Sequence, residues 1–409
     1  MRISEIEVLD LAPFAKGDVK FPSSPERGNF GEVHVFTGPN GTGKSRLLSV
    51  LAAATNWGAL TPSERFPEGL LCNGWKQTED KDGFSFLNDP STGKDLCSVK
   101  RPDLNSRILS FAFSGSLLIQ KSKIEILKNP GLPSAGEMIS FNSWIPGDIN
   151  QRIAYLKIQA AMEMMNGDSS KLGRTLKIAQ RLESTITEVT GRRFAVIAEA
   201  YPEPKLMFQW GDATIPIEGL PSGLNSLLSW MFAAATVMGL AFPESNDPLA
   251  EEAFFFLDEP ESYLHPEWQR KILPMAQRLF PNSQFFVATH SPFVVSSVNE
   301  GFIYKLIPDD DGVVTISEAI PASKGDSYVS AVSEILGMTE WFDPESEKLL
   351  AEFRKERDQA MKGNAEAESK VRRLADTISV RSDELANIIG MEMRQFERYL
   401  AKNTAPAAS

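Results

Sequence analysis

The residues best suited to chemistry form a glycine-rich loop that ends in a lysine and a hydroxyl. Residues 38–45 read Gly-Pro-Asn-Gly-Thr-Gly-Lys-Ser and satisfy every fixed position of the phosphate-binding pattern G-x-x-x-x-G-K-[S/T]. Its glycines let backbone N–H groups point at phosphate oxygens, Lys44 can reach the β- and γ-phosphates, and Ser45 can hold Mg²⁺. The pattern therefore predicts a site for ATP with Mg²⁺. The residues expected to line it are Gly38, Pro39, Asn40, Gly41, Thr42, Gly43, Lys44, Ser45 and Arg46.

The flanking residues give this loop the context that it needs. Residues 32–37 are mostly β-branched or aromatic and predict a short buried strand. Residues 46–54 are rich in leucine and alanine and predict a helix. A strand, a glycine loop and a helix in this order place the phosphates at a helix N-terminus, where the backbone supplies positive potential. A chance match in a glycine-rich turn is therefore disfavoured.

A second apolar run ends in two carboxylates. Residues 253–257 are wholly apolar, as expected for a central parallel strand that is covered by helices on both faces. At the end of such a strand, Asp258 would lie beside the loop and share the metal with Ser45. Glu259 would then polarise an attacking water as a general base. The alternative, an acidic turn that ends a core strand, is weak beside Lys44, so the pair indicates hydrolysis.

Two longer segments extend these motifs. Residues 258–266, Asp-Glu-Pro-Glu-Ser-Tyr-Leu-His-Pro, and residues 285–292, Phe-Phe-Val-Ala-Thr-His-Ser-Pro, resemble the ATPase heads of the structural-maintenance, recombination-repair (RecF) and overcoming-lysogenization-defect group. The resemblance implies an α/β, ABC-type head with a mostly parallel central sheet, an antiparallel N-terminal hairpin, a short helical arm and a C-terminal helical region. It also implies that His290 contacts the γ-phosphate and acts with Glu259 in catalysis.

The same resemblance implies a homodimer, or a higher homo-oligomer, that sandwiches ATP between two copies. Glu261 and Ser262 would lie in a loop that crosses the interface between the copies. His265, one helical turn further, is expected to cap the helix that begins at Pro266 rather than to act in the site.

The signature segment of the family is degenerate here. Residues 220–224, Leu-Pro-Ser-Gly-Leu, take the place of the family's Leu-Ser-Gly-Gly-Gln pattern, so that Ser222 and Gly223 would face ATP held by the other copy. Pro221 and Leu224 depart from that pattern, which predicts slow hydrolysis. A turn in which Ser222 caps a core helix is the alternative.

Two parts of the expected site have no clear counterpart. A strand over residues 107–113 ends where the family's glutamine loop begins, but the nearest glutamine is Gln120. Phe14 and Phe21 lie in the region from which an adenine-stacking ring would come. Both are better explained as core residues of an N-terminal hairpin over residues 3–21.

Composition and charge are those of an ordinary intracellular enzyme. A chain of 409 residues can hold one large domain with attachments. Its net charge of −12 argues against a surface that is given wholly to nucleic acid. Cys72 and Cys97 are too few for a disulfide framework, and the N-terminus lacks a signal-peptide core. The apolar stretch at 227–242 carries Ser and Trp and is expected to be buried core. We therefore expect a cytoplasmic protein without a membrane span.

We expect the head to occupy residues 1–324 and a helical region to occupy 325–409. Residues 57–105, which hold Pro, Gly, Asp and Lys without periodicity, predict a long irregular insert. Residues 145–193 predict two helices of roughly 22–30 Å each, too short for the long arms of chromosome-organising ATPases. Residues 151–193 carry eight Lys or Arg against four Asp or Glu, which predicts either a contact with DNA or a partner, or a solvated helix face.

The C-terminal region carries an apolar stripe at helical spacing behind a plausible cap. Such a stripe is most often core, although at a chain end it could dock a second protein. Its members are Leu385, Ile388, Ile389, Met393, Phe396 and Leu400.

No second chemistry is visible in the sequence. The acidic residues 309–311 precede Gly312 and predict a hairpin turn rather than a metal site. The chain has three histidines, and because His290 is already assigned to the ATP site, too few remain for an HNH nuclease. The compact head therefore resembles the ATPase subunits of anti-phage systems, above all Septu and less closely PARIS. That resemblance implies a separate effector protein, an HNH-type nuclease. The alternatives are a RecF-like repair ATPase that binds DNA through residues 151–193, and a slow nucleotide sensor.

Overall fold

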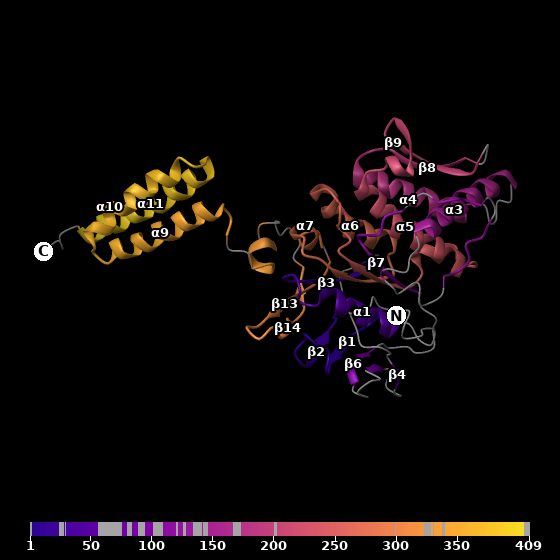
Figure 1. Ribbon diagram of the computed structural model, residues 1–409, viewed down its shortest axis with the longest axis horizontal. Coiled ribbons are helices and arrows are strands. Elements are labelled where there is room, and N and C mark those ends of the chain that lie inside the picture. Colours follow the sequence, from indigo (N-terminus) through magenta and orange to yellow (C-terminus); the bar gives the residue numbers. More distant parts are fainter. Residues whose placement is uncertain are drawn as a thin grey trace. The chain divides into compact units, whose positions relative to one another are not determined.

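The computed structural model divides into two compact units, Met1–Leu336 and Gly337–Ser409 (Figure 1). The domain boundary expected at residue 324 falls outside the described residues. Those residues are 2–23, 28, 30–55, 76–79, 84–88, 95–100, 109–119, 122–125, 128–133, 141, 146–166, 173–199, 203–298, 300–322, 329, 331–337 and 340–404.

The first unit is built on a mostly parallel sheet, as the sequence predicted. Five strands run parallel: β7 (Leu109–Ser114), β11 (Ala253–Asp258), β12 (Gln284–Ala288), β3 (Glu32–Thr37) and β13 (Gly301–Pro308). Two short strands, β14 (Val314–Ile316) and β15 (Ile320–Pro321), pair antiparallel with β13. The spatial order is β14-β13-β3-β12-β11-β7. Because parallel strands end at one edge, the segments that follow β3, β11 and β12 meet there.

Side chains of the central strands alternate between two hydrophobic cores, because successive residues of a strand point to opposite faces. On one face Phe255 and Leu257 join a core with α3 (Pro146–Asn166), α4 (Arg174–Thr190), α5 (Ser222–Ala241) and α6 (Pro266–Leu279). On the other face Phe254 and Phe256 join a core with α1 (Lys44–Thr55) and the N-terminal strands. Figure 1 shows α3 to α6 gathered on one side of the head.

The N-terminal strands form a five-stranded antiparallel sheet in the order β2-β1-β6-β5-β4. Its strands are β1 (Glu5–Val8), β2 (Gly17–Lys20), β4 (Lys76–Glu79), β5 (Phe84–Asn88) and β6 (Asp95–Lys100). The hairpin of β1 and β2 is confirmed. The prediction of an irregular insert over residues 57–105 is wrong for the described part of that range, which forms three strands. Cys97 and Val99 of β6 are buried and pair with Val8 and Ile6, so they complete a core that starts far away in sequence.

Helices α3 and α4 confirm the two helices expected over 145–193, but they pack onto the head instead of extending from it as an arm. Ile153 of α3 and Leu182 and Ile186 of α4 are buried in the same core as α5 and α6. A three-stranded antiparallel sheet follows them in the chain. Its strands are β8 (Phe194–Glu199), β9 (Lys205–Trp210) and β10 (Ala213–Pro216).

Helix α5 is a core helix, as expected for its apolar sequence. Among the described helices it alone is long and apolar enough to cross a membrane, yet 83% of that stretch is buried inside the protein. The remaining short elements of the unit are the 3₁₀ turns η2 (Ile217–Gly219) and η3 (Pro248–Ala250), helix α7 (Pro292–Val295) and the π-type turn η4 (Ala331–Ile335).

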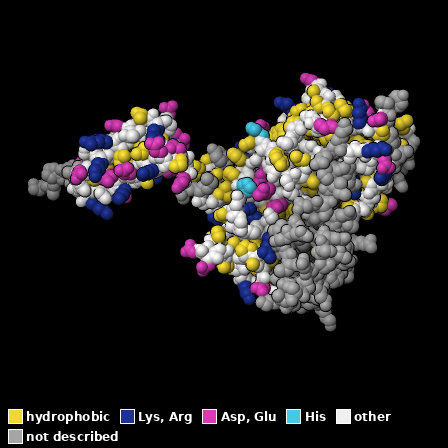
Figure 2. Space-filling model, viewed as in Figure 1, with side chains coloured by type: hydrophobic (Ala, Val, Ile, Leu, Met, Phe, Trp, Pro, Cys, Tyr) yellow, Lys and Arg dark blue, Asp and Glu magenta, His cyan; other side chains and the backbone are white. Residues whose placement is uncertain are grey.

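The second unit is a bundle of three helices, α9 (Pro344–Met361), α10 (Ala365–Ser379) and α11 (Asp383–Thr404). The apolar stripe of α11 faces its own bundle: Leu385, Ile389 and Phe396 are buried against residues of α9 and α10 such as Phe353 and Val371. The stripe is therefore core of this unit, and the alternative of an outward docking face is wrong. Figure 2 shows positive and negative side chains mixed over the outside of these helices.

Candidate nucleotide-binding site

The glycine-rich loop joins β3 to α1, and α1 begins at Lys44. Gly41 and Gly43 have φ of 82° and 86°, so their N–H groups take directions that most residues do not allow. Pro39, Asn40 and Gly41 form the exposed tip, while Thr42 is buried and its hydroxyl donates to Pro39 O at 2.9 Å. The loop thus presents its backbone at a helix N-terminus, the arrangement that suits a phosphate.

Lys44 is held across this loop. Its Nζ donates hydrogen bonds of 2.9 Å to the carbonyl oxygens of Gly38 and Pro39. Burial lowers the pKa of Lys44, and the negative charges of Glu259 and Asp258 oppose that shift. The ammonium therefore lies where the loop and the carboxylates meet.

Ser45 and Asp258 come together, as the two motifs require. The Ser45 hydroxyl donates to Asp258 Oδ1 at 3.0 Å. Burial raises the pKa of Asp258 to about 6; the Ser45 hydrogen bond opposes this rise and the charge of Glu259 adds to it. A hydroxyl and a carboxylate oxygen at the end of the phosphate loop are the hard oxygen ligands that Mg²⁺ takes, so the donor set fits this ion. Arg46 follows on α1, with its Nε buried and without a hydrogen-bond partner among the described residues.

Glu259 and His290 face each other at the same edge of the sheet. His290 Nδ1 lies 3.3 Å from Glu259 Oε1, and both side chains are about half exposed. The backbone of Glu259 has φ of 48°, which is uncommon outside glycine, and its N–H donates to Ala288 O at 2.9 Å. These two side chains can therefore reach a water or a phosphate that lies over the loop.

Gly115 was not predicted from the sequence as part of the site, although it packs directly against the backbone of Glu259. Its N–H donates to Asp258 O at 2.8 Å, and a Cβ placed on it would lie 1.8 Å from the carbonyl oxygen of Glu259. Only glycine allows the strand β7 to end this close to the carboxylate loop. The Ser114-Gly115 pair at a strand end was the available signal. Gln120 lies outside the described residues.

The signature segment begins α5. Ser222 is exposed at the first position of the helix, and the capping residue is Pro221, without a side-chain cap, so the alternative in which Ser222 caps this helix is wrong. Gly223 is buried against the loop that follows Glu259: a Cβ on it would lie 2.6 Å from Tyr263 O. The helix N-terminus therefore packs on the segment 259–265 of its own chain, which leaves Ser222 on the surface beside it.

Within this segment Glu261 is buried, with 6% of its surface exposed. Its carboxylate accepts a hydrogen bond from the buried hydroxyl of Thr289 of the same chain, and the expectation that the loop crosses to a second copy stays a prediction. The capping role of His265 is confirmed: its Nδ1 accepts from the N–H of Glu267 at 3.3 Å. In the same loop Tyr263 is 56% exposed and has φ of 65°.

Other expected features lie outside this centre. Phe14 and Phe21 are buried, as expected for core residues, and the ring of Phe14 lies against the phosphate loop at Gly43. The turn at residues 309–312 is confirmed, because Asp309 Oδ1 accepts the N–H groups of Asp311 and Val313 between β13 and β14.

The positive charge of residues 151–193 is partly taken up inside the chain. Lys157 pairs with Glu183 at 2.6 Å, and Arg181 pairs with Asp247 at 3.1 Å. Arg174 donates to the carbonyl oxygen of Pro243. These contacts weaken the support for a DNA contact through this segment.

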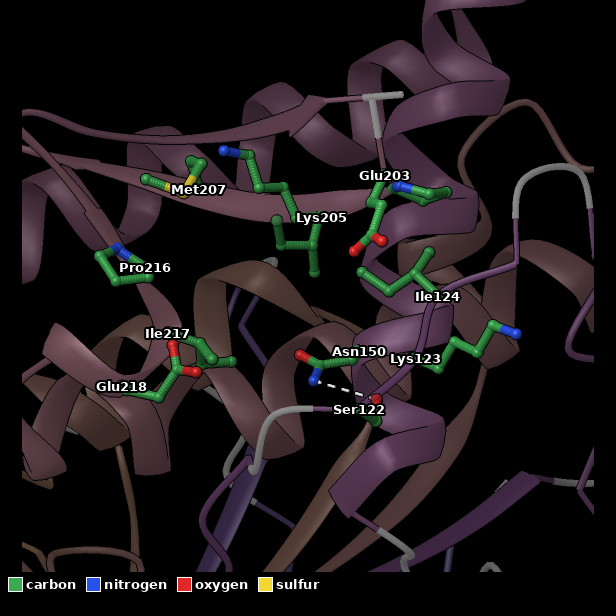
Figure 3. Close-up of a pocket in the computed structure, with 12 residues that line it drawn as sticks. Ser122, Lys123, Ile124, Asn150, Glu203, Lys205, Met207, Pro216, Ile217 and Glu218 are labelled. Carbon is green, nitrogen blue, oxygen red and sulfur yellow. Dashed lines mark hydrogen bonds between the residues drawn. The ribbon is translucent and has the colours of Figure 1, made fainter. Parts of the chain in front are cut away.

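A cavity of about 740 Å³ lies apart from the phosphate loop, between α3, β9 and η2. Figure 3 shows the side chains of Glu203 and Asn150 directed toward it and the ammonium of Lys123 directed away. Asn150 Nδ2 donates to Ser122 Oγ at 3.2 Å on one wall. Its lining contains none of the residues of the candidate site.

Comparison with known proteins finds similarity in the segments that carry Asp258, Glu259 and His290. Residues 100–296, which contain the Asp258–Glu259 and His290 segments but not the phosphate loop, match the family described as "AAA domain, putative AbiEii toxin, Type IV TA system". "Retron Ec83 probable ATPase" of Escherichia coli is 31% identical over 101 residues, which are 25% of this chain and 19% of that protein. "Septu protein PtuA" of Bacillus mycoides (strain KBAB4) is 23% identical over 304 residues, which are 71% of this chain and 38% of that protein. The chain thus spans well under half the length of these curated relatives.

Among solved structures, an "SmcHead bound to the C-winged helix domain of ScpA" is 14% identical with a TM-score of 0.43, over 79% of this chain and 99% of that one. A "recombination mediator protein RecF" structure is 13% identical with a TM-score of 0.39, over 77% of this chain and 98% of that one. Similarities at this level say nothing about activity. Residues 100–296 of this chain thus match this AAA-domain family, and the chain is related by sequence to the Septu and retron ATPases.

Proposed function

We propose that this protein binds ATP with Mg²⁺, hydrolyses it, and uses the nucleotide state to control a separate effector in anti-phage defence. The observation that carries the proposal is the meeting of Ser45, Asp258, Glu259 and His290 around Lys44 at one edge of the sheet. A loop that binds phosphate, a pair of metal ligands and a carboxylate beside a histidine are the parts that ATP hydrolysis needs.

The proposed mechanism assigns one task to each group. Lys44 and the loop N–H groups bind the β- and γ-phosphates, and Ser45 and Asp258 hold Mg²⁺, which would neutralise phosphate charge. Glu259 orients a water for in-line attack and accepts its proton, while His290 contacts the γ-phosphate. Both side chains are exposed enough to do so.

The defence role rests on the relatives. The names of the Septu and retron proteins support an ATPase subunit within an anti-phage system. We propose that the effector is a separate nuclease of HNH type, and that the protein acts in the cytoplasm. We also propose that two copies sandwich ATP, with Ser222 and Gly223 at the N-terminus of α5 turned toward the nucleotide of the other copy.

Hydrolysis by the purified full-length protein tests the first part. Lys44→Ala should abolish ATP binding, whereas Glu259→Gln should keep binding and lower turnover by about 10²-fold or more, the usual contribution of a general base. Glu267→Gln, a glutamate exposed on α6, serves as the matched control. Turnover of Glu259→Gln at the parental rate would contradict the proposed role. ATP binding without turnover in the parental protein would favour the nucleotide sensor.

Capture of the tagged full-length protein from its native host tests the second part. Mass spectrometry should identify a nuclease that co-purifies in a nucleotide-dependent way. A preparation that binds or cleaves DNA by itself, without a second protein, would instead favour the repair ATPase.

A further inference from the structure

Hydrogen bonds join the loop that follows Glu259 to the turn that carries His290. On one side of His290, the hydroxyl of Thr289 donates to Glu261 Oε1. The same Thr289 oxygen accepts the backbone N–H of Ser291 at 2.9 Å. Glu261, two residues after Glu259, thus contacts the residue directly before His290.

A second path closes on the other side of His290. The hydroxyl of Ser291 donates to Gln269 Oε1 at 2.6 Å, and Gln269 Nε2 donates to Leu264 O at 2.9 Å. The N–H of Leu264 in turn donates to Glu261 O at 2.9 Å. The result is a closed ring of hydrogen bonds through Glu261, Thr289, Ser291, Gln269 and Leu264, which we call the Glu261 ring.

The Glu261 ring is shielded from water where it meets His290. Thr289 is fully buried, and Glu261 and Ser291 are each 6% exposed. Glu261 Oε2 has no hydrogen-bond partner among the described residues. Within that part of the chain, the carboxyl group of Glu261 is therefore held through its other oxygen, by Thr289. A buried hydrogen bond without competing water holds its two segments in one arrangement more firmly than an exposed one does.

We propose that Glu261 is a positioning residue for hydrolysis. Through Thr289 it fixes the backbone on which His290 stands, and thereby sets the 3.3 Å separation between His290 and Glu259. Burial raises the pKa of Glu261, and the hydrogen bond from Thr289 opposes that rise. The inference rests on the proposed ATPase function, because it assigns a role within the same site.

Steady-state kinetics on the full-length protein give the first test. Glu261→Ala should lower kcat by about 10- to 100-fold, the cost of a misplacement near 1 Å, and should leave ATP affinity within about threefold of the parent. Glu261→Gln, which keeps the shape and an acceptor for Thr289, should stay within about threefold of the parental kcat. Thr289→Val removes the same bond and also the acceptor of the Ser291 N–H, so it should lower kcat at least as much as Glu261→Ala, and the double variant should lose no more than Thr289→Val alone. Glu267→Ala is the control.

A histidine NMR spectrum gives a second test that needs no turnover. The chain has three histidines, His34, His265 and His290, so their ring signals can be assigned by substitution. Glu261→Ala should shift the His290 signal and leave that of the buried His34 in place, which also reports that the head is folded. An unshifted His290 signal, or a kcat that Glu261→Ala leaves unchanged, would overturn the proposal. If the parental protein lacks turnover, the ATPase proposal fails while the NMR result still decides the role of Glu261.

Discussion

Ser45 and Asp258 share a hydrogen bond of 3.0 Å across 213 positions of sequence. Ser45 follows β3 and Asp258 is the last residue of β11; these strands are not neighbours, because β12 lies between them in the sheet. The order of the strands, rather than any local contact, therefore brings the phosphate loop and the carboxylates together. This relationship can be tested one side chain at a time.

Ser45→Ala should weaken Mg²⁺-dependent ATP binding by about 10- to 100-fold, because it removes the proposed metal ligand and the hydroxyl that donates to Asp258. Ser45→Thr keeps the hydroxyl and should restore binding. Isothermal titration with and without Mg²⁺ measures the effect. Ser49→Ala is the control, since the hydroxyl of Ser49 donates to the Ser45 carbonyl within α1 at 2.8 Å. Equal Mg²⁺ dependence in Ser45→Ala and the parent would remove Ser45 from the metal site.

An ATP sandwich can be tested by mixing two inactive variants. Ser222→Arg blocks the exposed start of α5, and Lys44→Ala blocks the phosphate loop. A mixture should recover activity, because one composite site per heterodimer keeps both residues. Ser222 is the better position for this test than Gly223, whose substitution would collide with Tyr263 of the same chain. Specific activity that does not depend on concentration in a monomeric protein would tell against the sandwich.

Gly115→Ala should destabilise the head by about 1–3 kcal/mol or more, the cost of overpacking, because its Cβ meets the backbone of Glu259 at 1.8 Å. Gly219→Ala is the matched control, since its Cβ would meet its nearest neighbour at an ordinary 3.5 Å. Urea unfolding of both variants, with ATP turnover of the folded fraction, separates the two cases. A fully stable Gly115→Ala protein would mean that β7 can move away from Glu259.

A change in the core of the three-helix unit should destabilise that unit alone. Phe396 of α11 is buried against the other helices of the unit, so Phe396→Ala should lower the free energy of unfolding of this unit by about 3–5 kcal/mol. The head should keep its melting temperature and its ATP affinity, because its cores contain no residue of this unit. Differential scanning calorimetry should show one transition move and the other remain. A fall in both transitions would show that the two units depend on each other.

The ionisation of Glu32 should make the free energy of unfolding depend on pH. Burial alone would raise the pKa of Glu32, but hydrogen bonds and charges from His34 and Arg2 lower it to about 2. Because the folded pKa lies below the unfolded value of 4.5, the stabilisation is complete above pH 4.5 and is lost as pH falls toward 2. Glu32→Gln should therefore be less stable by on the order of 3 kcal/mol at neutral pH. In urea titrations this difference should stay constant from pH 8 to 5 and shrink below; a constant gap at pH 3 would contradict it.

The sequence could predict those parts of the site that short motifs encode. The glycine loop, Asp258 with Glu259, and the helix cap at His265 each depend on a few adjacent residues, and the structure has them as expected. Gly115 and Glu261 could not be assigned in this way, because their importance comes from distant partners: the carbonyl of Glu259 and the hydroxyl of Thr289.

The same difference between local and distant sequence signals applies to the fold. A continuous apolar run is enough to indicate β11 as a central strand, because each of its faces meets a core. The strands β4 to β6 are short and separated by turn residues, so no window of sequence shows their period. Their place is set by the pairing of β6 with β1, about ninety positions earlier, and by the pairing of β5 with β6 and of β4 with β5.

The loop from Glu259 to His265, besides its side-chain hydrogen bonds, packs directly against the backbone of two glycines. Gly115 supports it at Glu259, and Gly223 supports it at Tyr263. Side chains can absorb a displacement by changing rotamer, but two glycines in direct contact with carbonyl groups cannot. A displacement of the exposed ring of Tyr263 would therefore move the loop as one stiff segment and shift both Glu259 and the start of α5.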